Sequence, residues 1–313
     1  MFISTKTMFR VAIKEKFAVP AFNVNNMEII QAIISGANTE KSPVILQVSA
    51  GARKYANPYF LKNLVEAAIQ TYPDIPVALH LDHGSDLNLV KDCVDKGFTS
   101  IMIDASKFEL DKNINTTKEV VDFCHSKEIP VEAELGKLAG IEDDVSVDTR
   151  DAKFTDPKEA KKFVEETNCD SLAIAIGTSH GAYKFAGEPY LSFNRLAEIE
   201  KEIPNFPLVL HGASSVPQNW VKKCNDFGGD LPGARGVPEN MLEKAAKNFN
   251  ICKINIDTDL RIVFTASVRE FLKNNPGEFD PRKYLGMARK NLENIVKQKI
   301  RMCNSNNKIR FFS

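Results

Sequence analysis

The sequence predicts an α/β fold of the (β/α)8-barrel, or TIM-barrel, class. Eight short apolar runs alternate with stretches that carry apolar residues at helical spacing, which is typical of parallel strands joined by right-handed crossovers. The chain has 313 residues, 43% of them hydrophobic, and eight such units in about 250 residues is the size of this barrel. We expect a single domain over residues 1–313, with a last helix and a polar, frayed tail from about residue 284.

The predicted strands share a short apolar core, and several begin at proline, which suits a strand's first residue. They cover residues 19–24, 43–49, 76–82, 100–106, 130–136, 171–177, 207–213 and 251–257. The predicted helices between the first six strands start with Asn or Asp, which are good N-caps. They cover residues 26–40, 57–72, 86–98, 115–128 and 156–168, with later helices at 260–272 and 285–302.

A doubly wound open sheet is the alternative fold. It calls for a glycine-rich turn after the first strand, and "AFNVNNMEII" contains no glycine. Two connections are longer than ordinary loops, residues 136–156 and 225–240, and long loops in compact domains are often lids or binding loops.

Composition excludes little but points to a cytoplasmic protein. Lys+Arg and Asp+Glu both number 41, so the zero net charge gives no indication of nucleic-acid or membrane binding. We expect neither a signal peptide nor a membrane span, because charges interrupt every apolar stretch at the N-terminus and no run is long enough to cross a bilayer. Six scattered cysteines without a CxxC pair predict reduced thiols rather than disulfides or a zinc ribbon.

Polar side chains gather where the predicted strands end. Each strand from the third to the eighth ends in, or runs into, a carboxylate or an imidazole: Asp82, His83, Asp104, Glu132, Glu134, His180, His211, Asp257 and Asp259. Asn255 lies at the end of the eighth strand, and Lys184 and Arg261 follow closely. Active sites of such barrels lie at the carboxyl ends of the strands. Three of the five histidines, His83, His180 and His211, are each followed by glycine, which permits close approach of a ligand.

Three converging imidazoles indicate a divalent-metal site with an open position. Zinc fits best, and cobalt, manganese and iron remain open. His80 shares a strand face with Asp82, so we interpret it as an interior residue that supports the site. His125 is predicted to lie on a solvated helix face. Glu132 is interpreted as a supporting neighbour of Glu134.

Two further residues leave alternatives open. Lys253 lies inside the eighth predicted strand, and a buried lysine could form a Schiff base with a carbonyl substrate. In that case the histidines would have no role, so we favour the metal. Asp259 is predicted to cap the helix that follows it.

Seven motifs together resemble those of the class II, metal-dependent fructose-1,6-bisphosphate aldolases of the type B branch, from about residue 19 to about residue 298. The motifs are "AFNVNN", "LDHG", "MIDAS", "VEAELG", "AIAIGTSHGAYK", "LHGASSVP" and "INIDTDLR". The resemblance implies a homo-oligomer, either a dimer or a tetramer, that acts in glycolysis and gluconeogenesis. It also implies one catalytic zinc per subunit and a monovalent cation, Na⁺ or K⁺, beside a substrate phosphate.

The resemblance also implies roles for individual residues. His83, His180 and His211 would be the zinc ligands, with Glu134 and Asp104 at or near an alternative, buried zinc position. Asp82 would move the proton of the sugar hydroxyl, and Glu142 in the long loop would exchange a proton with the three-carbon ketone half. Ala139 stands where that loop usually has a glycine. The substrate contacts would be Asn23, Ser49, Gly181, Lys184, Gly212, Ser214, Asn255, Asp257, Thr258 and Arg261, with Ser49 and Arg261 near the far phosphate.

The predicted activity is therefore reversible cleavage of fructose 1,6-bisphosphate to dihydroxyacetone phosphate and glyceraldehyde 3-phosphate. An aldolase for the epimer tagatose 1,6-bisphosphate is the first alternative, and "DTDLR" favours fructose. A metal-dependent hydrolase on the same barrel is the second; it would need a carbamylated lysine or paired histidines on the first strand, and "AFNVNN" has neither. A non-catalytic metal-binding or sugar-phosphate-binding protein is the third, and Asp82 and Glu142 argue against it.

Overall fold

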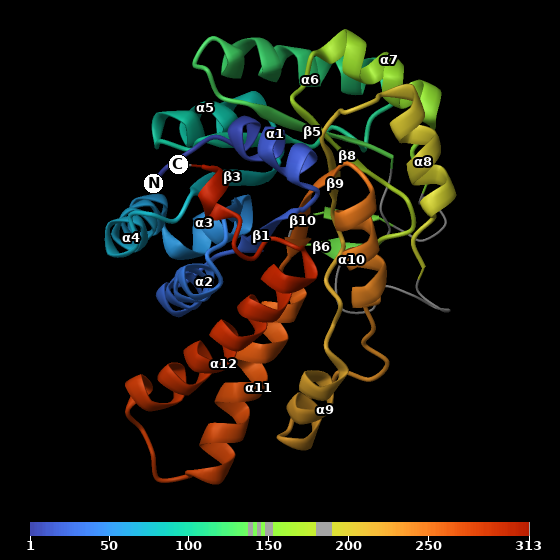
Figure 1. The fold of residues 1–313 in the computed structure, drawn as a ribbon. Helices are drawn as coiled ribbons and strands as arrows, with labels where there is room; N and C mark the ends of the chain where they lie inside the picture. Colours follow the sequence, from blue (N-terminus) through green and yellow to red (C-terminus); the bar gives the residue numbers. More distant parts are fainter. Residues whose placement is uncertain (137–139, 143–144, 148–152, 180–189, 313) are drawn as a thin grey trace.

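The protein folds as a closed barrel of parallel strands surrounded by helices (Figure 1). The computed structural model describes residues 1–136, 140–142, 145–147, 153–179 and 190–312, with the backbone alone for 140–142 and 145–147. Within these residues the strand order around the barrel is β1-β10-β9-β8-β5-β4-β3-β2. This arrangement confirms the predicted (β/α)8 fold.

Each of the eight predicted strands is present in the barrel. They are β1 (Val19–Asn23), β2 (Val44–Ser49), β3 (Val77–Gly84), β4 (Ser100–Ile103), β5 (Val131–Leu135), β8 (Ser171–Ile174), β9 (Leu208–Leu210) and β10 (Ile251–Ile256). A small antiparallel hairpin, β6 (Gly140–Glu142) and β7 (Val145–Val147), lies within the long connection after β5.

Seven of the helices in the described residues lie where helices were predicted, and five more, α1, α3, α8, α9 and α10, were not predicted. In chain order, the helices are α1 (Thr5–Glu15), α2 (Met27–Glu40), α3 (Ala50–Ala56), α4 (Pro58–Thr71), α5 (Leu87–Asp95), α6 (Leu110–His125), α7 (Pro157–Thr167), α8 (Phe193–Glu202), α9 (Gln218–Asp226), α10 (Glu239–Asn248), α11 (Thr258–Asn274) and α12 (Pro281–Met302). The Asn26, Asp86 and Asp156 side chains accept amide hydrogen bonds at the starts of α2, α5 and α7, as their positions predict.

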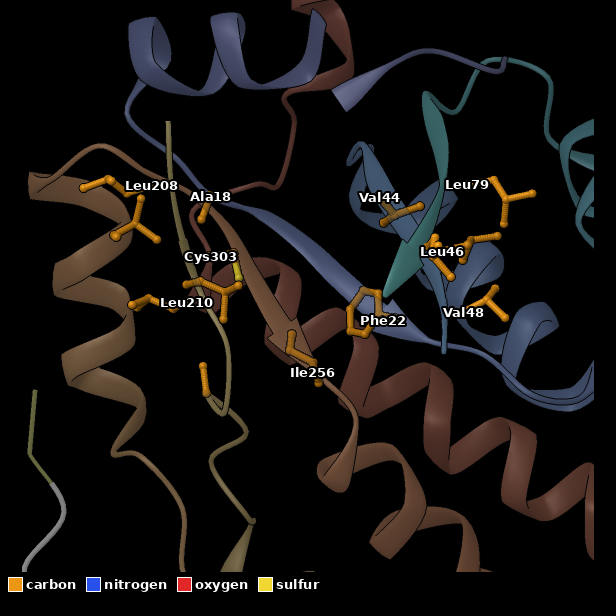
Figure 2. Close-up of a cluster of buried hydrophobic side chains, with 14 of the residues drawn as sticks. Ala18, Phe22, Val44, Leu46, Val48, Leu79, Leu208, Leu210, Ile256 and Cys303 are labelled. Atoms are coloured by element: carbon orange, nitrogen blue, oxygen red, sulfur yellow. The ribbon is translucent and has the colours of Figure 1, made fainter. Parts of the chain in front are cut away.

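Alternation along each strand decides which side chains face the barrel interior. On β2, Val44, Leu46 and Val48 point outward into the main apolar core beneath the helices, so Gln47 and Ser49 point inward. Figure 2 shows this outer core, with Leu79 of β3 and Leu210 of β9 also contributing to it. The same parity turns the polar residues of the other strands toward the barrel axis.

The amino-terminal end of the barrel is covered by α1, which the sequence interpretation missed. Met8 and Phe9 of α1 pack with Ile45, Ala78 and Cys252, which lie on three of the barrel strands. Charged residues alternate with these apolar ones, so the segment presented only a short amphipathic pattern. Because α1 fills this end, the opposite end is the one that can admit a substrate.

The chain after α12 is packed, which contradicts the predicted frayed tail. Cys303 and Ser305 are fully buried. The Ala18 amide donates to the Cys303 carbonyl (3.0 Å), and the Ser42 and Ser305 hydroxyls are 2.8 Å apart. These contacts join the tail to the residues just before β1 and just after α2, and a short 3-10 helix, Ile309–Phe311, follows.

Asp259 does not cap α11, which corrects the prediction for this residue. The N-cap position is Asp257, and Asp259 lies in the first turn of the helix with its carboxylate fully buried. It forms an ion pair with Lys299 of α12 (2.7 Å), whose side chain is also fully buried. Burial would raise the pKa of Asp259, but Lys299 and the backbone amides that donate to the carboxylate outweigh burial and lower this pKa.

This ion pair predicts a specific dependence of stability on acid. The folded-state pKa of Asp259 is lowered, so its stabilisation is present above the unfolded value of about 3.9 and is lost as the pH falls through the folded value. Between about pH 5 and pH 2, we expect the free energy of unfolding to fall more steeply for the wild type than for Asp259→Asn. Urea unfolding at a series of pH values measures this difference. Equal slopes for the two proteins would show that Asp259 is not ionised against Lys299.

No described helix is both long and apolar enough to cross a membrane. All six cysteines are free and buried, as the absence of paired cysteine motifs predicts.

Candidate active site

The site lies at the carboxyl ends of the barrel strands, where the inward-facing polar residues meet. His83, His211 and Asp82 lie here with acceptor atoms within 4.8 Å of one another. His180, Gly181, Lys184 and Ala139 are outside the described residues, and so is the side chain of Glu142. The structure thus brings together two of the three predicted histidine ligands and leaves the place of the third untested.

His83 is aimed by a local break in the sheet. The register between β3 and β4 shifts between Leu81 and Gly84, so His83 occupies a bulge. Its φ of 48° is uncommon outside glycine. A Cβ at Gly84 would lie 2.4 Å from the Met102 carbonyl oxygen, so only glycine allows the strands to approach here. The glycine after His83 therefore has the close-approach role that the sequence predicts.

The two described imidazoles face each other. His83 Nε2 is 3.0 Å from His211 Nδ1, and the ring centroids are 4.7 Å apart in an edge-to-face arrangement. Zn–N bonds of about 2.1 Å in a tetrahedral site place two ligand nitrogens about 3.4 Å apart, close to this separation.

Neighbouring carboxylates select the tautomers of both rings. Asp104 lies 2.8 Å from His83 Nδ1, and Glu132 lies 2.7 Å from His211 Nε2, so both of these nitrogens donate. The two remaining nitrogens, His83 Nε2 and His211 Nδ1, then face each other as possible donors to one cation, and Asn255 Nδ2 lies 3.1 Å from the second. This donor set therefore fits a divalent metal.

A second group of possible ligands shares His83 with the first. His83, Asp104 and Glu134 lie together, with Glu134 Oε2 at 3.6 Å from His83 Nδ1. Burial opposes protonation of His83, but Asp104, Asp82 and Glu134 outweigh it and raise the pKa of His83 well above its usual value. This concentration of negative charge attracts a cation to either group, which is consistent with two metal positions.

A buried charge cluster lies beneath His211. Lys253 Nζ is 2.9 Å from Glu132 Oε2 and 3.1 Å from His80 Nε2. These three residues and His211 are almost completely inaccessible to solvent. Burial would raise the pKa of Glu132, but Lys253 and His211 hold it well below its usual range. Burial lowers the pKa of His211, favouring the neutral ring that a metal ligand requires. Lys253 is thus engaged as an ion pair rather than exposed as a Schiff-base nucleophile.

Asp82 is held by side-chain amides from three strands. Its Oδ2 accepts from Asn23 Nδ2 (2.8 Å) and Gln47 Nε2 (3.3 Å), and its Oδ1 lies 3.4 Å from Asn255 Nδ2. Gln47 was missed at the sequence level, although a glutamine inside the apolar run "PVILQVS" is the signal that identifies it. Two buried oxygens, Gln47 Oε1 and Asn255 Oδ1, have no hydrogen-bond partner within the described part of the chain. These two oxygens can accept hydrogen bonds from the hydroxyl groups of a bound molecule.

The predicted phosphate contacts cluster around the start of α11. A Cβ at Gly212 would lie 2.6 Å from the Ser179 carbonyl oxygen, and the φ of Gly212 is 58°. Ser214 Oγ accepts from the Asp257 amide (3.3 Å), which brings the end of β9 to the N-terminus of α11. Helix N-termini favour anions. Thr258 is the first residue of this helix.

The residues expected near the far phosphate lie in two places. Arg261 Nε and Nη2 pair with the two oxygens of Asp257, each at 2.8 Å, and the Arg261 side chain is 47% exposed. Ser49 ends β2 and is buried; its hydroxyl caps α3 by accepting from the Ala52 amide. Arg261 therefore lies beside Asp257, among the contacts predicted for the phosphate on the dihydroxyacetone side, and not beside Ser49.

The remaining two histidines have contacts of their own. His80 is fully buried and its Nδ1 lies 2.8 Å from Ser100 Oγ, in keeping with an interior, supporting position. His125 differs from the prediction of a solvated face. Its side chain is only 30% exposed, and its Nε2 lies 2.7 Å from Asp170 at the far end of the barrel.

A closed parallel barrel with imidazoles and carboxylates gathered at its carboxyl ends defines a barrel enzyme whose site suits a divalent cation. A family model described as fructose-bisphosphate aldolase class-II matches residues 3–308. The chain belongs to the class II fructose-bisphosphate aldolase family. The family is metal-dependent and acts on a sugar bisphosphate, so the predicted family and enzyme class, a carbon–carbon lyase, are confirmed.

Individual proteins agree with this assignment. The fructose-bisphosphate aldolase of Treponema pallidum (strain Nichols) is 48% identical, with 95% of this chain and 94% of that protein covered. The fructose-bisphosphate aldolase of Thermus caldophilus is 49% identical, with 97% and 99% covered. Among solved structures, the YdjI aldolase from Escherichia coli K12 has a TM-score of 0.79 at 31% identity, covering 99% of this chain and all of that one (100%).

Proposed function

We propose that this chain reversibly cleaves fructose 1,6-bisphosphate to dihydroxyacetone phosphate and glyceraldehyde 3-phosphate, with the residues described above as its machinery. The observation that carries the proposal is the position of Asp82, a buried carboxylate directly beside the two facing imidazoles of His83 and His211. Membership of the family supplies the reaction class.

The cation would be held by His83 and His211, with His180 as the third ligand. When bound, it supplies a Lewis acid that draws electron density from the substrate carbonyl and its neighbouring oxygen. Asp104 and Glu132 keep both described imidazoles in the tautomer that offers a lone pair to it. Asp104 and Glu134 are proposed to receive the ion in an alternative position that shares His83.

Asp82 would accept the proton of the sugar hydroxyl as the carbon–carbon bond breaks. A general base needs geometry first, and the amides of Asn23 and Gln47 fix the orientation of this carboxylate. Asn255 lies between Asp82 and His211 and would contact the hydroxyls of the three-carbon half. Glu142 is proposed to exchange the proton of that half from the long loop.

The two phosphates would be bound at the rim. Gly212, Ser214, Asp257 and Thr258, with Gly181 and Lys184, are proposed to hold the phosphate on the dihydroxyacetone side. Backbone amides and a helix N-terminus suit an anion there. Ser49 and Arg261 were both expected at the far phosphate, but Arg261 pairs with Asp257, one of the residues proposed for the first phosphate. We therefore propose Ser49 for the far phosphate, and Arg261, which can bind two phosphate oxygens at once, for the side of the pocket next to Asp257.

The finer properties of the enzyme are also proposals. We infer zinc as the metal, because imidazole donors with an open position suit it, with cobalt, manganese or iron as substitutes. We further infer a monovalent cation, Na⁺ or K⁺, near the loops of Gly181 and Gly212, a homodimer or homotetramer, a single domain and a cytoplasmic location. Free, buried thiols support a reducing compartment.

The alternative substrate is tagatose 1,6-bisphosphate, which differs at one hydroxyl. Initial rates on the two epimeric bisphosphates, measured with the metal content of the same sample, decide between them. We expect kcat/KM for the fructose compound to be higher by roughly tenfold or more, since one misplaced hydroxyl leaves buried polar groups unpaired. Preference for tagatose 1,6-bisphosphate would overturn the substrate assignment, and turnover of neither would favour a binding protein.

A further inference from the structure

A buried ion cluster lies outside the catalytic pocket and holds the turn that follows His211. We call residues Ser214, Ser215 and Val216 the Ser214–Val216 turn. The Asp259 carboxylate accepts hydrogen bonds from the last two backbone amides of this turn, from Ser215 N at 3.1 Å and from Val216 N at 2.7 Å. One side chain at the start of α11 thus fixes two consecutive peptide groups of the turn.

Lys299 completes the cluster from the far side. Its Nζ lies 2.7 Å from Asp259, 2.6 Å from Glu239 and 2.5 Å from Ser215 Oγ, and the side chain is fully buried. Lys299 belongs to α12, Asp259 to α11 and Glu239 to α10. The turn is therefore tied to three helices by charged side chains, of which Lys299 and Asp259 are fully buried and Glu239 is half-exposed. Charge-assisted hydrogen bonds of this kind are strong and directional.

The backbone of the turn needs this restraint. Val216 has a φ of 52°, which is costly for a β-branched residue and persists only where the surroundings impose it. Val216 is fully buried and packs with Ala234 and Ile262. Gly236 lies against the other side of the turn, where a Cβ would be 2.2 Å from the Ser214 carbonyl oxygen. The turn is thus clamped between Asp259 and the backbone at Gly236.

The clamped turn connects to the site through Ser214. The Ser214 hydroxyl accepts from the Asp257 amide, and Ser214 lies three residues after His211. Movement of the turn would shift the Ser214 hydroxyl relative to the N-terminus of α11. Lys299 itself is fully buried and acts only through its contacts.

We propose that Lys299, through Asp259, is a positioning residue for substrate phosphate: it holds the Ser214–Val216 turn in the conformation that binds the phosphate on the dihydroxyacetone side. This inference rests on the proposed function for the placement of that phosphate. Loss of the clamp should weaken phosphate binding in the ground state and the transition state alike, which raises KM and leaves kcat nearly unchanged.

The test compares Lys299→Met with wild type on fructose 1,6-bisphosphate and on fructose 1-phosphate, which lacks the far phosphate. We expect KM to rise roughly tenfold on both substrates, with kcat within about threefold of wild type. The inhibition constant of inorganic phosphate should rise by a similar factor. Lys299→Arg, which retains the charge and the donors, should restore KM. Lys297→Met, on the same helix but paired with Glu293, is the matched control and should behave as wild type.

Thermal unfolding and metal content show whether each variant is folded and loaded. If Lys299→Met does not fold, Glu239→Gln replaces it in the same experiment. Glu239 contacts both Lys299 and Ser215, and because its side chain is half-exposed, this change should disturb folding less. It should raise KM by roughly threefold. A folded variant with unchanged KM and phosphate inhibition, or with reduced kcat at constant KM, would overturn the proposal. Wild-type turnover tests the proposed function separately, and phosphate affinity by calorimetry tests the clamp without turnover.

Discussion

The His211→Ala variant is expected to lose its divalent metal and, with it, nearly all aldol cleavage. A metal supplies several kcal/mol of charge stabilisation, and about 1.4 kcal/mol corresponds to a factor of ten, so activity should fall by roughly a thousandfold or more. The fold should survive, because Glu132 keeps Lys253 as its partner when the imidazole is removed. Metal analysis and initial rates on the same sample measure both effects.

His125→Ala is the matched control for this experiment. It removes an imidazole that also pairs with a carboxylate, Asp170, but at the opposite end of the barrel. Metal content and kcat should match the wild type. If His211→Ala retained one metal ion per chain with full activity, His211 would not be a ligand and the description of the site would be wrong.

The Asp82→Asn variant is expected to keep its metal and lose its rate. Asparagine retains the shape of the side chain but cannot take a proton from the sugar hydroxyl, so kcat should fall by about 10²- to 10⁴-fold, the usual contribution of a general base. KM should change little, because the neighbouring hydrogen bonds hold the side chain rather than the substrate. Steady-state kinetics with metal analysis gives both quantities.

Gln47→Glu is a useful companion to Asp82→Asn. It places a second carboxylate beside Asp82 and tests whether the neutral amide donors contribute to the role of Asp82 as a base.

Two results for Asp82→Asn would contradict this role. A large loss of metal would make Asp82 a metal ligand, since its carboxylate lies within reach of both imidazoles. A decrease in kcat smaller than about tenfold would remove Asp82 from the role of base.

Sequence patterns predict the barrel well because each strand carries its own signal. Val44, Leu46 and Val48 occupy one face of β2 by alternation, and the same rule turns His80 and Asp82 to the interior of β3. Parallel strands then bring their carboxyl ends to one rim. His83 and His211, which are 128 positions apart, meet at 3.0 Å for that reason.

Other features depend on contacts that local patterns do not encode. Asp259 follows a strand and precedes a helix, which is the pattern of a cap, but Lys299 lies 40 positions later and draws the carboxylate into a buried pair. The segment after α12 appears polar in sequence, yet Ser305 is buried against Ser42. Gln47 is an isolated polar residue until Asn23 and Asp82 surround it. Such pairings follow from tertiary packing.

Metal titration of the stripped enzyme tests the central claim most directly, namely that a cation held by His83 and His211 beside Asp82 carries the reaction. After removal of metal by a strong chelator, cleavage of fructose 1,6-bisphosphate should cease. Added zinc or cobalt should restore it in proportion, with saturation at one catalytic ion per chain. Activity that survives complete metal removal, together with trapping of substrate on a lysine by borohydride, would contradict this account.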